Sequence, residues 1–413
     1  MQKFLEKNRW VVLVASVLVW SCTNFPSLWA VFQADAAAAY GITLEESAML
    51  FPMCTVFFGI SSIIGGRLQD KFPPNIVSAI GGVIMASGVI MLSVFGEGTS
   101  VMKLYLCFCL PFGGGCGFIF PAVSASIMKW YADKKGFAMG LSLALASGIL
   151  VFLTYISKYL LNTWGSQKTF FVYGVVFMIV TVSCTLILVN PTREYIQEKL
   201  AISNAASSGT AVQETKIVDF TSVEMLKTKQ FYLLFIAAIF SVPAYMLIAP
   251  SIVTLGIQRG LSESLAVSSV AVATGVSAIG KFIIPTISDK IGRKRSAIIF
   301  TMLATFFSVL LMKATGISLL VIYSALVFAH SGWTTLISPF VTDLFGTANA
   351  GANMGIISLY STIASLGSSF VLAMLAPILG PSAAHIIGIV GIAISVALVA
   401  MIDTNTAKLK EAE

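Results

Sequence analysis

The sequence predicts an all-α integral membrane protein with twelve transmembrane helices in two six-helix bundles. Of the 413 residues, 57% are hydrophobic and only 10% are charged, whereas roughly a quarter of the residues in a soluble domain are charged. The apolar residues fall into windows of about 20, the length that a helix needs to cross a bilayer. A charged motif also occurs twice, about half a chain apart and each time at the end of an apolar window. This repetition indicates two related halves, as in many transporters.

The apolar windows provide six helices in each half, because unpaired strands cannot satisfy their backbone groups in hydrocarbon. The expected spans are 10–32, 46–68, 75–95, 102–128, 136–160, 168–190, 230–251, 264–288, 296–313, 316–340, 352–376 and 381–402. The polar stretch between the two sets has an Ala/Ser/Gly-rich middle that is typical of a flexible linker. We therefore expect an N-terminal bundle over 1–190, a cytoplasmic linker over 191–229 and a C-terminal bundle with a short tail over 230–413.

The basic residues predict the orientation in the membrane. Most of the 25 Lys and Arg residues fall in segments on the same side as both termini. The opposite side holds Lys103, Lys158, Lys168, Arg259 and Lys313. Because an excess of basic residues marks the cytoplasmic side, we expect both termini in the cytoplasm and the chain in the cell (inner) membrane. This distribution accounts for the net charge of +7 without nucleic acid as a partner.

Glycine, proline and cysteine in the spans are interpreted structurally. The run from Gly113 to Gly117 has no strand before it and no Lys-Ser/Thr after it, so helix packing is favoured over phosphate binding. Prolines within the spans are expected to bend helices, and they are Pro26, Pro52, Pro111, Pro121, Pro243, Pro250, Pro285 and Pro339. The six cysteines lie in apolar windows without metal-ligand spacing, and no nucleophile–base arrangement occurs. We expect no metal, no cofactor and no enzymatic activity.

The repeated motif carries a family resemblance. It reads Gly66-Arg67-Leu68-Gln69-Asp70-Lys71 in the first half and Ser288-Asp289-Lys290-Ile291-Gly292-Arg293-Lys294-Arg295 in the second. Together with two sets of six spans, this motif resembles the major facilitator superfamily over almost the whole chain. The resemblance implies a gating role for Asp70, Lys71, Asp289, Lys290 and Arg293, which would hold helix ends together in one conformation. In the first copy Pro73 and Pro74 replace the expected Gly and Arg.

Three further stretches resemble the oxalate/formate antiporter family, relatives of the monocarboxylate transporters. They are Lys129-Trp130-Tyr131-Ala132-Asp133-Lys134-Lys135-Gly136, then Glu224-Met225-Leu226-x-Thr228-x-Gln230-Phe231, and Asp343-Leu344-Phe345-Gly346 leading to Asn353-x-Gly355. This resemblance implies a small organic carboxylate as the substrate.

Lys281 is the charged residue that matters most to this interpretation. It precedes Asp289 by eight positions and therefore lies about 12 Å deeper along a helix. A charge at this depth needs water or a partner, although a lysine can also extend its amine to the interface. The family resemblance places the substrate-binding cation here, usually as arginine. Lysine supplies a point charge in place of a bidentate fork.

The number of cations bears on the substrate. Relatives that exchange oxalate carry a second cation eight residues after the span-eleven asparagine, and here that position is Ser361. Because one cation balances one carboxylate better than two, a monocarboxylate is favoured over oxalate.

The acidic residues bear on the coupling mode. All 18 Asp and Glu residues can be assigned to loops, termini or helix ends, with Asp35 nearest to a span. Proton symporters commonly keep a carboxylate in the membrane, so its absence favours anion exchange. Protons remain an alternative partner, because His330 in span ten can titrate near neutral pH or serve as a neutral packing residue. A non-transporting membrane sensor is the third alternative.

Aromatic and polar residues complete the expected site. The family pattern would put Trp29, Phe32, Phe120, Tyr245 and Trp333 near the substrate, although each ring can equally pack against helices or lipid. Asn24 and Thr334 are candidate donors to a carboxylate, and a backbone-bonded hydroxyl is the favoured alternative for Thr334. We expect a monomer in the lipid bilayer.

Overall fold

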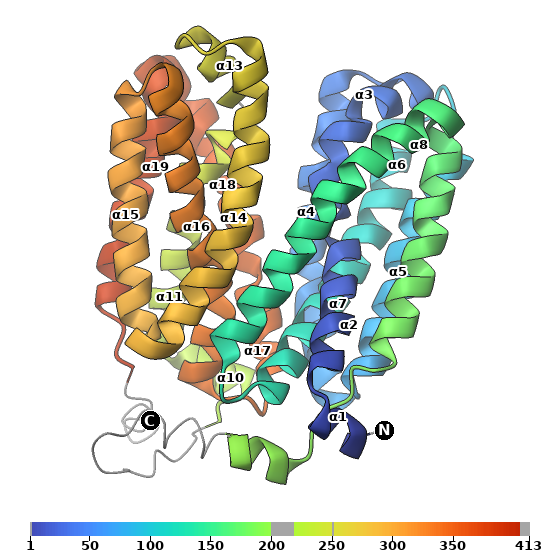
Figure 1. Ribbon diagram of the computed structural model, residues 1–413, viewed down its shortest axis with the longest axis vertical. Coiled ribbons are helices and arrows are strands. Elements are labelled where there is room, and N and C mark those ends of the chain that lie inside the picture. The colour runs from blue at the N-terminus through green and yellow to red at the C-terminus, as the bar shows by residue number, and fades with distance from the viewer. Residues whose placement is uncertain (1, 200–218, 250–251, 405–413) are drawn as a thin grey trace. The chain divides into compact units, whose positions relative to one another are not determined.

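The structure, a computed structural model, describes residues 2–199, 219–249 and 252–404. Every regular element in these ranges is helical (Figure 1), so the all-α prediction is confirmed. The first half of the chain contains α1 (Gln2–Lys7), α2 (Trp10–Thr23), η1 (Phe25–Leu28), α3 (Trp29–Tyr40), α4 (Leu44–Lys71), α5 (Pro74–Val94), α6 (Val101–Leu104), η2 (Tyr105–Cys109), α7 (Leu110–Trp130) and α8 (Lys135–Thr185).

The second half contains a corresponding set of helices. They are α10 (Ser222–Lys227), α11 (Lys229–Ser241), α12 (Pro243–Met246), α13 (Ile252–Gln258), α14 (Glu263–Ile291), α15 (Arg293–Lys313), α16 (Gly316–Phe345), α17 (Ala350–Ile357), α18 (Leu359–Leu379), η4 (Gly380–Ser382) and α19 (Ala383–Ala400).

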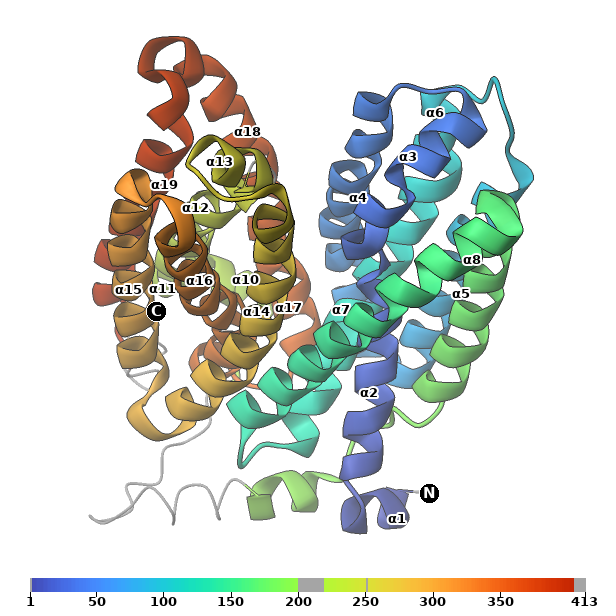
Figure 2. The same ribbon diagram turned by 45° about the horizontal axis from the view of Figure 1, so that its top comes forward.

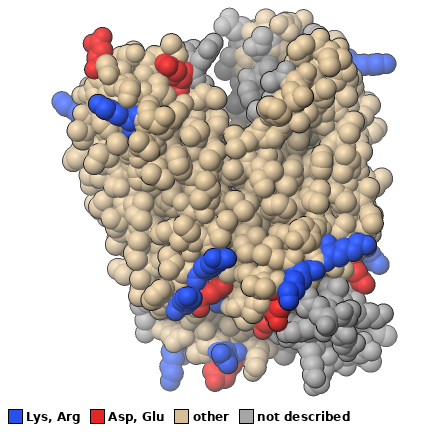
Figure 3. Space-filling model, turned by 180° about the vertical axis from the view of Figure 1, so that it is seen from behind, with Lys and Arg blue, Asp and Glu red and all other residues tan. Residues whose placement is uncertain are grey.

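These helices supply the twelve predicted crossings. In the described part of the chain, ten helical stretches are long and apolar enough to span a membrane. One of them, α8, has 51 residues and contains Gly165 in a non-helical conformation (φ 74°, ψ 174°), so it makes two crossings. The first crossing is made by α2, η1 and α3 together. Figure 3 shows charged side chains gathered toward the two ends of the visible face, with an uncharged band between them.

Some element boundaries differ from the predicted ones. The first crossing was expected to end at residue 32, but α3 continues to Tyr40 and stops at Gly41, which is left-handed (φ 69°). The reason is that a run of alanines, the best helix formers, follows Gln33. Asp35 consequently lies on a helix, with its side chain exposed.

The prolines have two different effects. Pro26 lies in the 3₁₀ segment η1, and Pro243 begins the short helix α12, so the first and seventh crossings are broken there. Four others remain within continuous helices, and they are Pro52, Pro121, Pro285 and Pro339. Pro111 follows the π-helical segment η2 within one continuous helical run from Val101 to Trp130, so its missing N–H falls where the hydrogen-bond pattern changes from π to α. Pro250 lies outside the described residues.

The chain forms two compact units (Figure 2). One comprises Met1–Asp133, Leu145–Ala206 and Thr347–Leu359, and the other comprises Lys134–Ala144, Ser207–Gly346 and Tyr360–Glu413. Two short segments therefore pack with the opposite half of the chain. In the first unit α4 packs on α7 and α17, and in the second α14 and α15 pack on α16.

Small residues permit this packing in the first unit. A Cβ atom at Gly117 of α7 would lie 2.7 Å from the carbonyl oxygen of Phe58 in α4. The glycine run therefore serves close helix contact, as the sequence suggested.

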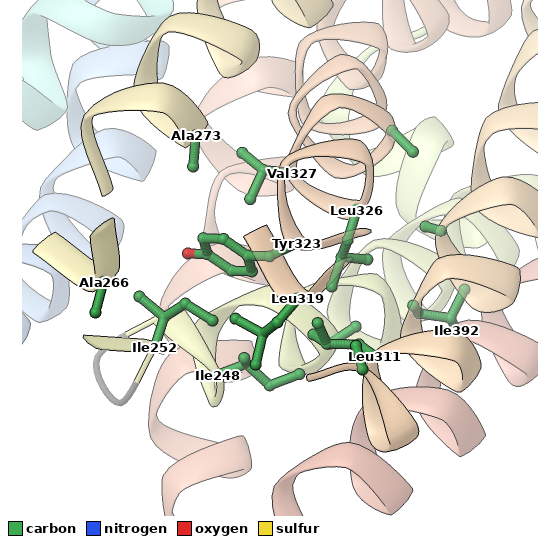
Figure 4. Close-up of a cluster of buried hydrophobic side chains, with 14 of the residues drawn as sticks. Ile248, Ile252, Ala266, Ala273, Leu311, Leu319, Tyr323, Leu326, Val327 and Ile392 are labelled. Carbon is green, nitrogen blue, oxygen red and sulfur yellow. The ribbon is translucent and has the colours of Figure 1, made fainter. Parts of the chain in front are cut away.

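The second unit has a buried hydrophobic core around Tyr323 (Figure 4). The side chains of Ile248 and Ile252, which follow the break in the seventh crossing, and those of Leu319 and Val327 in α16 surround it. Tyr245, at that break, is partly buried against the same core. The packing thus fixes the broken segment on α16.

Candidate functional site

Lys281 lies beside a close approach of α14 to α16. A Cβ atom at the neighbouring Gly280 would lie 2.6 Å from the carbonyl oxygen of Phe328, and the Ser331 hydroxyl donates to the Ser277 carbonyl oxygen (3.1 Å). A Cβ atom at Gly140 of α8 would lie 2.5 Å from the Lys281 carbonyl oxygen, so α8 approaches α14 equally closely. The Lys281 side chain is only partly exposed. The backbones of α14, α16 and α8 therefore pack closely around the backbone of Lys281.

His330 and Tyr245 join Lys281 in the second unit. The imidazole of His330 stacks on the ring of Tyr245, with centroids 5.0 Å apart and an interplanar angle of 22°. It is also hydrogen-bonded to the backbone of Ser241, and the Lys281 charge acts on it electrostatically. The structure thus brings together a cation, an imidazole and an aromatic wall. Such a cluster can bind one carboxylate by charge and shape the space beside it.

Trp333 and Thr334 follow His330 on α16. Trp333 is 1% exposed, and among the described residues its indole N–H has no hydrogen-bond partner. The Thr334 hydroxyl donates to the Ser331 carbonyl oxygen (2.9 Å), so in this structure its proton is not available to a carboxylate. Ser361 is partly buried on α18, where its carbonyl oxygen accepts a hydrogen bond from the Ser365 hydroxyl (2.7 Å).

Trp29 and Phe32 belong to the aromatic core of the first unit. The Trp29 indole stacks on Phe108 (5.4 Å, 25°), and its N–H donates to the Ser47 carbonyl oxygen (2.8 Å). Phe32 is fully buried and packs on Phe25 (5.3 Å). In this structure both rings therefore pack the interior of the unit.

Asn24 and Phe120 occupy less buried positions of that unit. Asn24 ends α2 at the break in the first crossing, and its side-chain amide donates to the Trp20 carbonyl oxygen (2.9 Å). Phe120 is partly buried, with its ring against Trp20 (5.2 Å) and Phe58 (5.5 Å). Paired breaks at corresponding positions of two repeats are a physical indication of a transport site, because they free backbone groups at midplane depth. Asn24 and Tyr245 each lie at such a break.

Asp289 is bound to the start of α8. Its carboxylate accepts hydrogen bonds from the backbone N–H groups of Gly136 (3.0 Å) and Phe137 (2.9 Å). The first N–H groups of a helix lack intrahelical partners and carry partial positive charge, so this end favours an anion. Arg293, one turn after Asp289, pairs with the same carboxylate at 2.5 Å. Lys290 is exposed.

Two further charges extend the Asp289 contact. Arg293 Nε donates to Asp343 at 2.9 Å, and the Lys135 ammonium donates to the other oxygen of Asp343 at 2.7 Å. Lys135 and Asp343 were not predicted as gating residues. Both occur in stretches that carried the family resemblance, and charged residues at span ends were the only signal that could have identified them.

Asp70 binds the start of α17 in the same way. Its carboxylate accepts from the backbone N–H groups of Gly351 (3.1 Å) and Ala352 (3.0 Å). Lys71 is exposed. These backbone partners were also missed, because a backbone N–H has no identifying side chain.

A separate ion pair lies outside the membrane-spanning helices. Arg9 contacts Asp133 through both terminal nitrogens, at 2.6 and 3.1 Å, and its guanidinium lies 4.5 Å from the centroid of the Tyr131 ring. Burial alone would lower the pKa of Arg9, but the Asp133 carboxylate more than offsets it and the pKa is raised. This pair fastens the start of α2 to the segment after α7.

Comparison with known proteins places the chain among membrane transporters. Residues 9–369 match the Major Facilitator Superfamily. The oxalate:formate antiporter of Oxalobacter formigenes is 26% identical over 84% of this chain and 80% of its own length. Monocarboxylate transporter 2 of Rattus norvegicus is 26% identical over 49% of this chain and 41% of its own.

A solved structure has the same fold. The superfamily transporter FucP, captured in the outward conformation, superposes with a TM-score of 0.67 at 13% identity, covering 95% of this chain and 98% of FucP. This match confirms the predicted twelve-helix fold of two six-helix bundles.

Proposed function

Because the chain belongs to the Major Facilitator Superfamily, whose members are membrane transporters, we propose that it carries small organic anions by alternating access around Lys281. The observation that carries the proposal is the cluster of Lys281, His330 and Tyr245 in one unit. A partly buried cation beside an aromatic wall offers a carboxylate both charge and shape. The two relatives described above, an oxalate:formate antiporter and a monocarboxylate transporter, support this substrate class.

A monocarboxylate is favoured over oxalate. Ser361 occupies the position at which oxalate-exchanging relatives would carry a second cation. A dianion at a site with one cation would keep an unbalanced charge, which is costly away from water.

Anion exchange is the favoured transport mode. A bound carboxylate neutralises Lys281, so the occupied site can cross between its two access states more easily than the empty, charged site. Proton-coupled symport is the second candidate, because a bound carboxylate that neutralises Lys281 removes the charge that opposes protonation of His330.

Gating is assigned to the two aspartate contacts. Asp70 and Asp289, with Lys71, Lys290 and Arg293, hold helix starts in one access state and release them in the other. In this proposal residues 1–190 and 230–413 form the two bundles, 191–229 link them in the cytoplasm, and a monomer resides in the inner membrane with both termini inside.

Counterflow in liposomes tests the proposal. Purified wild-type chain is reconstituted with internal carboxylates, and uptake of labelled monocarboxylate is compared with that of Lys281→Ala. Loss of one charged contact of about 3 kcal/mol lowers uptake about hundredfold. Lys281→Arg keeps the charge and retains part of the activity, while Lys313→Ala, which removes an exposed lysine from α15, retains all of it.

Three results would change the proposal. Wild-type uptake in Lys281→Ala would remove Lys281 from the site. Uptake driven by a pH gradient into empty liposomes would replace exchange with symport, and rapid net efflux without counter-anion would also exclude obligate exchange.

A further inference from the structure

A basic cavity lies at the first turn of α15, apart from the Lys281 site. It has a volume of about 400 Å³, and the helix start that lines it is the lower end of α15 in Figure 1. Three consecutive basic residues, Arg293, Lys294 and Arg295, line it. Only Asp343 opposes them among the lining side chains, and its two oxygens already bind Lys135 and Arg293. The cavity therefore retains an excess of positive charge.

Two of these cations retain capacity for a ligand. Lys294 donates one hydrogen bond to the Ile402 carbonyl oxygen (2.7 Å), which leaves two of the three ammonium protons for other acceptors. Arg295 is exposed, and among the described residues it forms no ion pair within 4.0 Å. Its planar guanidinium can bind a phosphate through two parallel hydrogen bonds.

The backbone N–H groups at the start of α15 add to the positive potential of the cavity. Gly292 precedes α15 in a left-handed conformation (φ 91°), and the first turn of the helix has neither an acidic residue nor a side-chain cap. The opening N–H groups of a helix favour anions. In this way they reinforce the three side chains without forming a site alone.

The cavity also has an exposed apolar side chain at headgroup depth. Phe340 and Leu344 of α16 lie at the base of the cavity and are only 1% and 2% exposed, so the accessible apolar side chain is Ile291 at the end of α14. The spans Ala271–Ile291 and Arg293–Lys313 end and begin here, so lipid headgroups reach this depth. Basic pockets between helices on the cytoplasmic side suit anionic headgroups.

We propose that this cavity binds the phosphate of an anionic phospholipid. The phosphate contacts Lys294 and Arg295, and the adjacent acyl chain covers the exposed side chain of Ile291. The combination of cations with an exposed apolar side chain distinguishes an amphiphile from free inorganic phosphate, which needs only the cations. This site is independent of the proposed transport substrate.

Binding to the purified full chain in neutral detergent tests the proposal. Native mass spectrometry measures occupancy by short-chain phosphatidylglycerol, with short-chain phosphatidylcholine as the zwitterionic comparison and inorganic phosphate as a competitor. Phosphatidylglycerol is expected to bind more tightly than phosphatidylcholine, and Arg295→Gln is expected to weaken it about fivefold. Lys313→Gln, at the other end of α15, leaves binding unchanged.

Arg295→Gln is the primary variant because Arg295 makes no described contact that folding would lose. Lys294→Gln follows as the second variant, with thermal unfolding checked first because it removes the bond to Ile402. Equal binding of the two lipids, or unchanged binding in both variants, overturns the proposal. Displacement of the lipid by stoichiometric phosphate identifies free phosphate as the ligand and overturns the lipid assignment.

Discussion

Asp70 and Asp289 make the same contact in the two units but differ in everything around it. Each carboxylate binds the second and third residues of another helix, α17 for Asp70 and α8 for Asp289, at 2.9 to 3.1 Å. Asp289 is joined by Arg293, Asp343 and Lys135. Among the described residues Asp70 forms no ion pair. Both aspartates accept hydrogen bonds from the first N–H groups of another helix, and only the contact of Asp289 is extended by ion pairs.

The sequence difference behind this asymmetry is small. Four residues after Asp289 stands Arg293, and four residues after Asp70 stands Pro74. Proline has no charge and cannot pair with the carboxylate, so Asp70 keeps its two backbone hydrogen bonds and the more distant charge of Lys129 but lacks an adjacent ion pair. The comparison teaches that the Asp289 contact is the stronger of the two and should be more costly to release.

Neutralising the aspartates is expected to have the largest effect. Asp289→Asn weakens two charged hydrogen bonds and leaves Arg293 with Asp343 as its one carboxylate partner among the described residues, at a cost of about 3 kcal/mol. Asp70→Asn costs about 2 kcal/mol, because only the backbone contacts weaken. Thermal unfolding and counterflow of the two variants, beside the exposed-acid control Glu97→Gln, measure the difference. Equal losses of stability and of counterflow in the two variants would mean that the ion pairs add nothing to the Asp289 contact.

Replacing glycine by alanine at the two helix starts that the aspartates bind is expected to have the second-largest effect. A Cβ atom at Gly136 would meet the backbone carbonyl oxygen of Pro285, whereas at Gly351 it would meet the side-chain oxygen of Gln69. A side chain can move and a packed backbone cannot. We expect Gly136→Ala to cost about 3 kcal/mol and Gly351→Ala about 1 kcal/mol.

Thermal unfolding of the two alanine variants measures this difference. Gly148→Ala is the matched control, because a Cβ atom there has no neighbour within 4 Å. A larger loss of stability in Gly351→Ala than in Gly136→Ala would contradict the expectation that the neighbour of Gly351 can move and that of Gly136 cannot.

Substitution of the residue before each aspartate is expected to have the smallest effect. Gln69 is 2% exposed, and within the described chain neither of its amide atoms has a hydrogen-bond partner. The equivalent Ser288 hydroxyl donates to the Pro285 carbonyl oxygen (2.6 Å) and accepts from Arg293. Gln69→Leu removes an unpaired polar group and should stabilise the Asp70 contact by about 1 kcal/mol.

Opposite shifts in melting temperature would support this assignment. Gln69→Leu should raise the temperature and slow counterflow, because the α17 start is released less often. Ser288→Ala should lower it, because Arg293 loses an acceptor. A lower melting temperature in Gln69→Leu would show that the amide is satisfied in the membrane.

Composition and spacing alone determined the membrane location, the twelve crossings and the repeated halves. The cost of placing charge or an unpaired backbone group in hydrocarbon acts on each segment separately, so it is visible in local windows of sequence. The same cost made Lys281 conspicuous as a cation well inside a span. Continuation of α3 to Tyr40 was missed only because alanine is less apolar than the residues before it.

Tertiary structure alone decided which groups meet. The Asp289 and Asp70 contacts join residues 153 and 281 positions apart, and each uses backbone N–H groups that every residue but proline possesses. Trp29 and Phe32 lie in a packed core, while Tyr245 and His330 stack near Lys281, although the family resemblance put Trp29, Phe32 and Tyr245 near the substrate alike. Packing selects among such partners because only the fold sets distance and orientation, and the sequence carries no local mark of either.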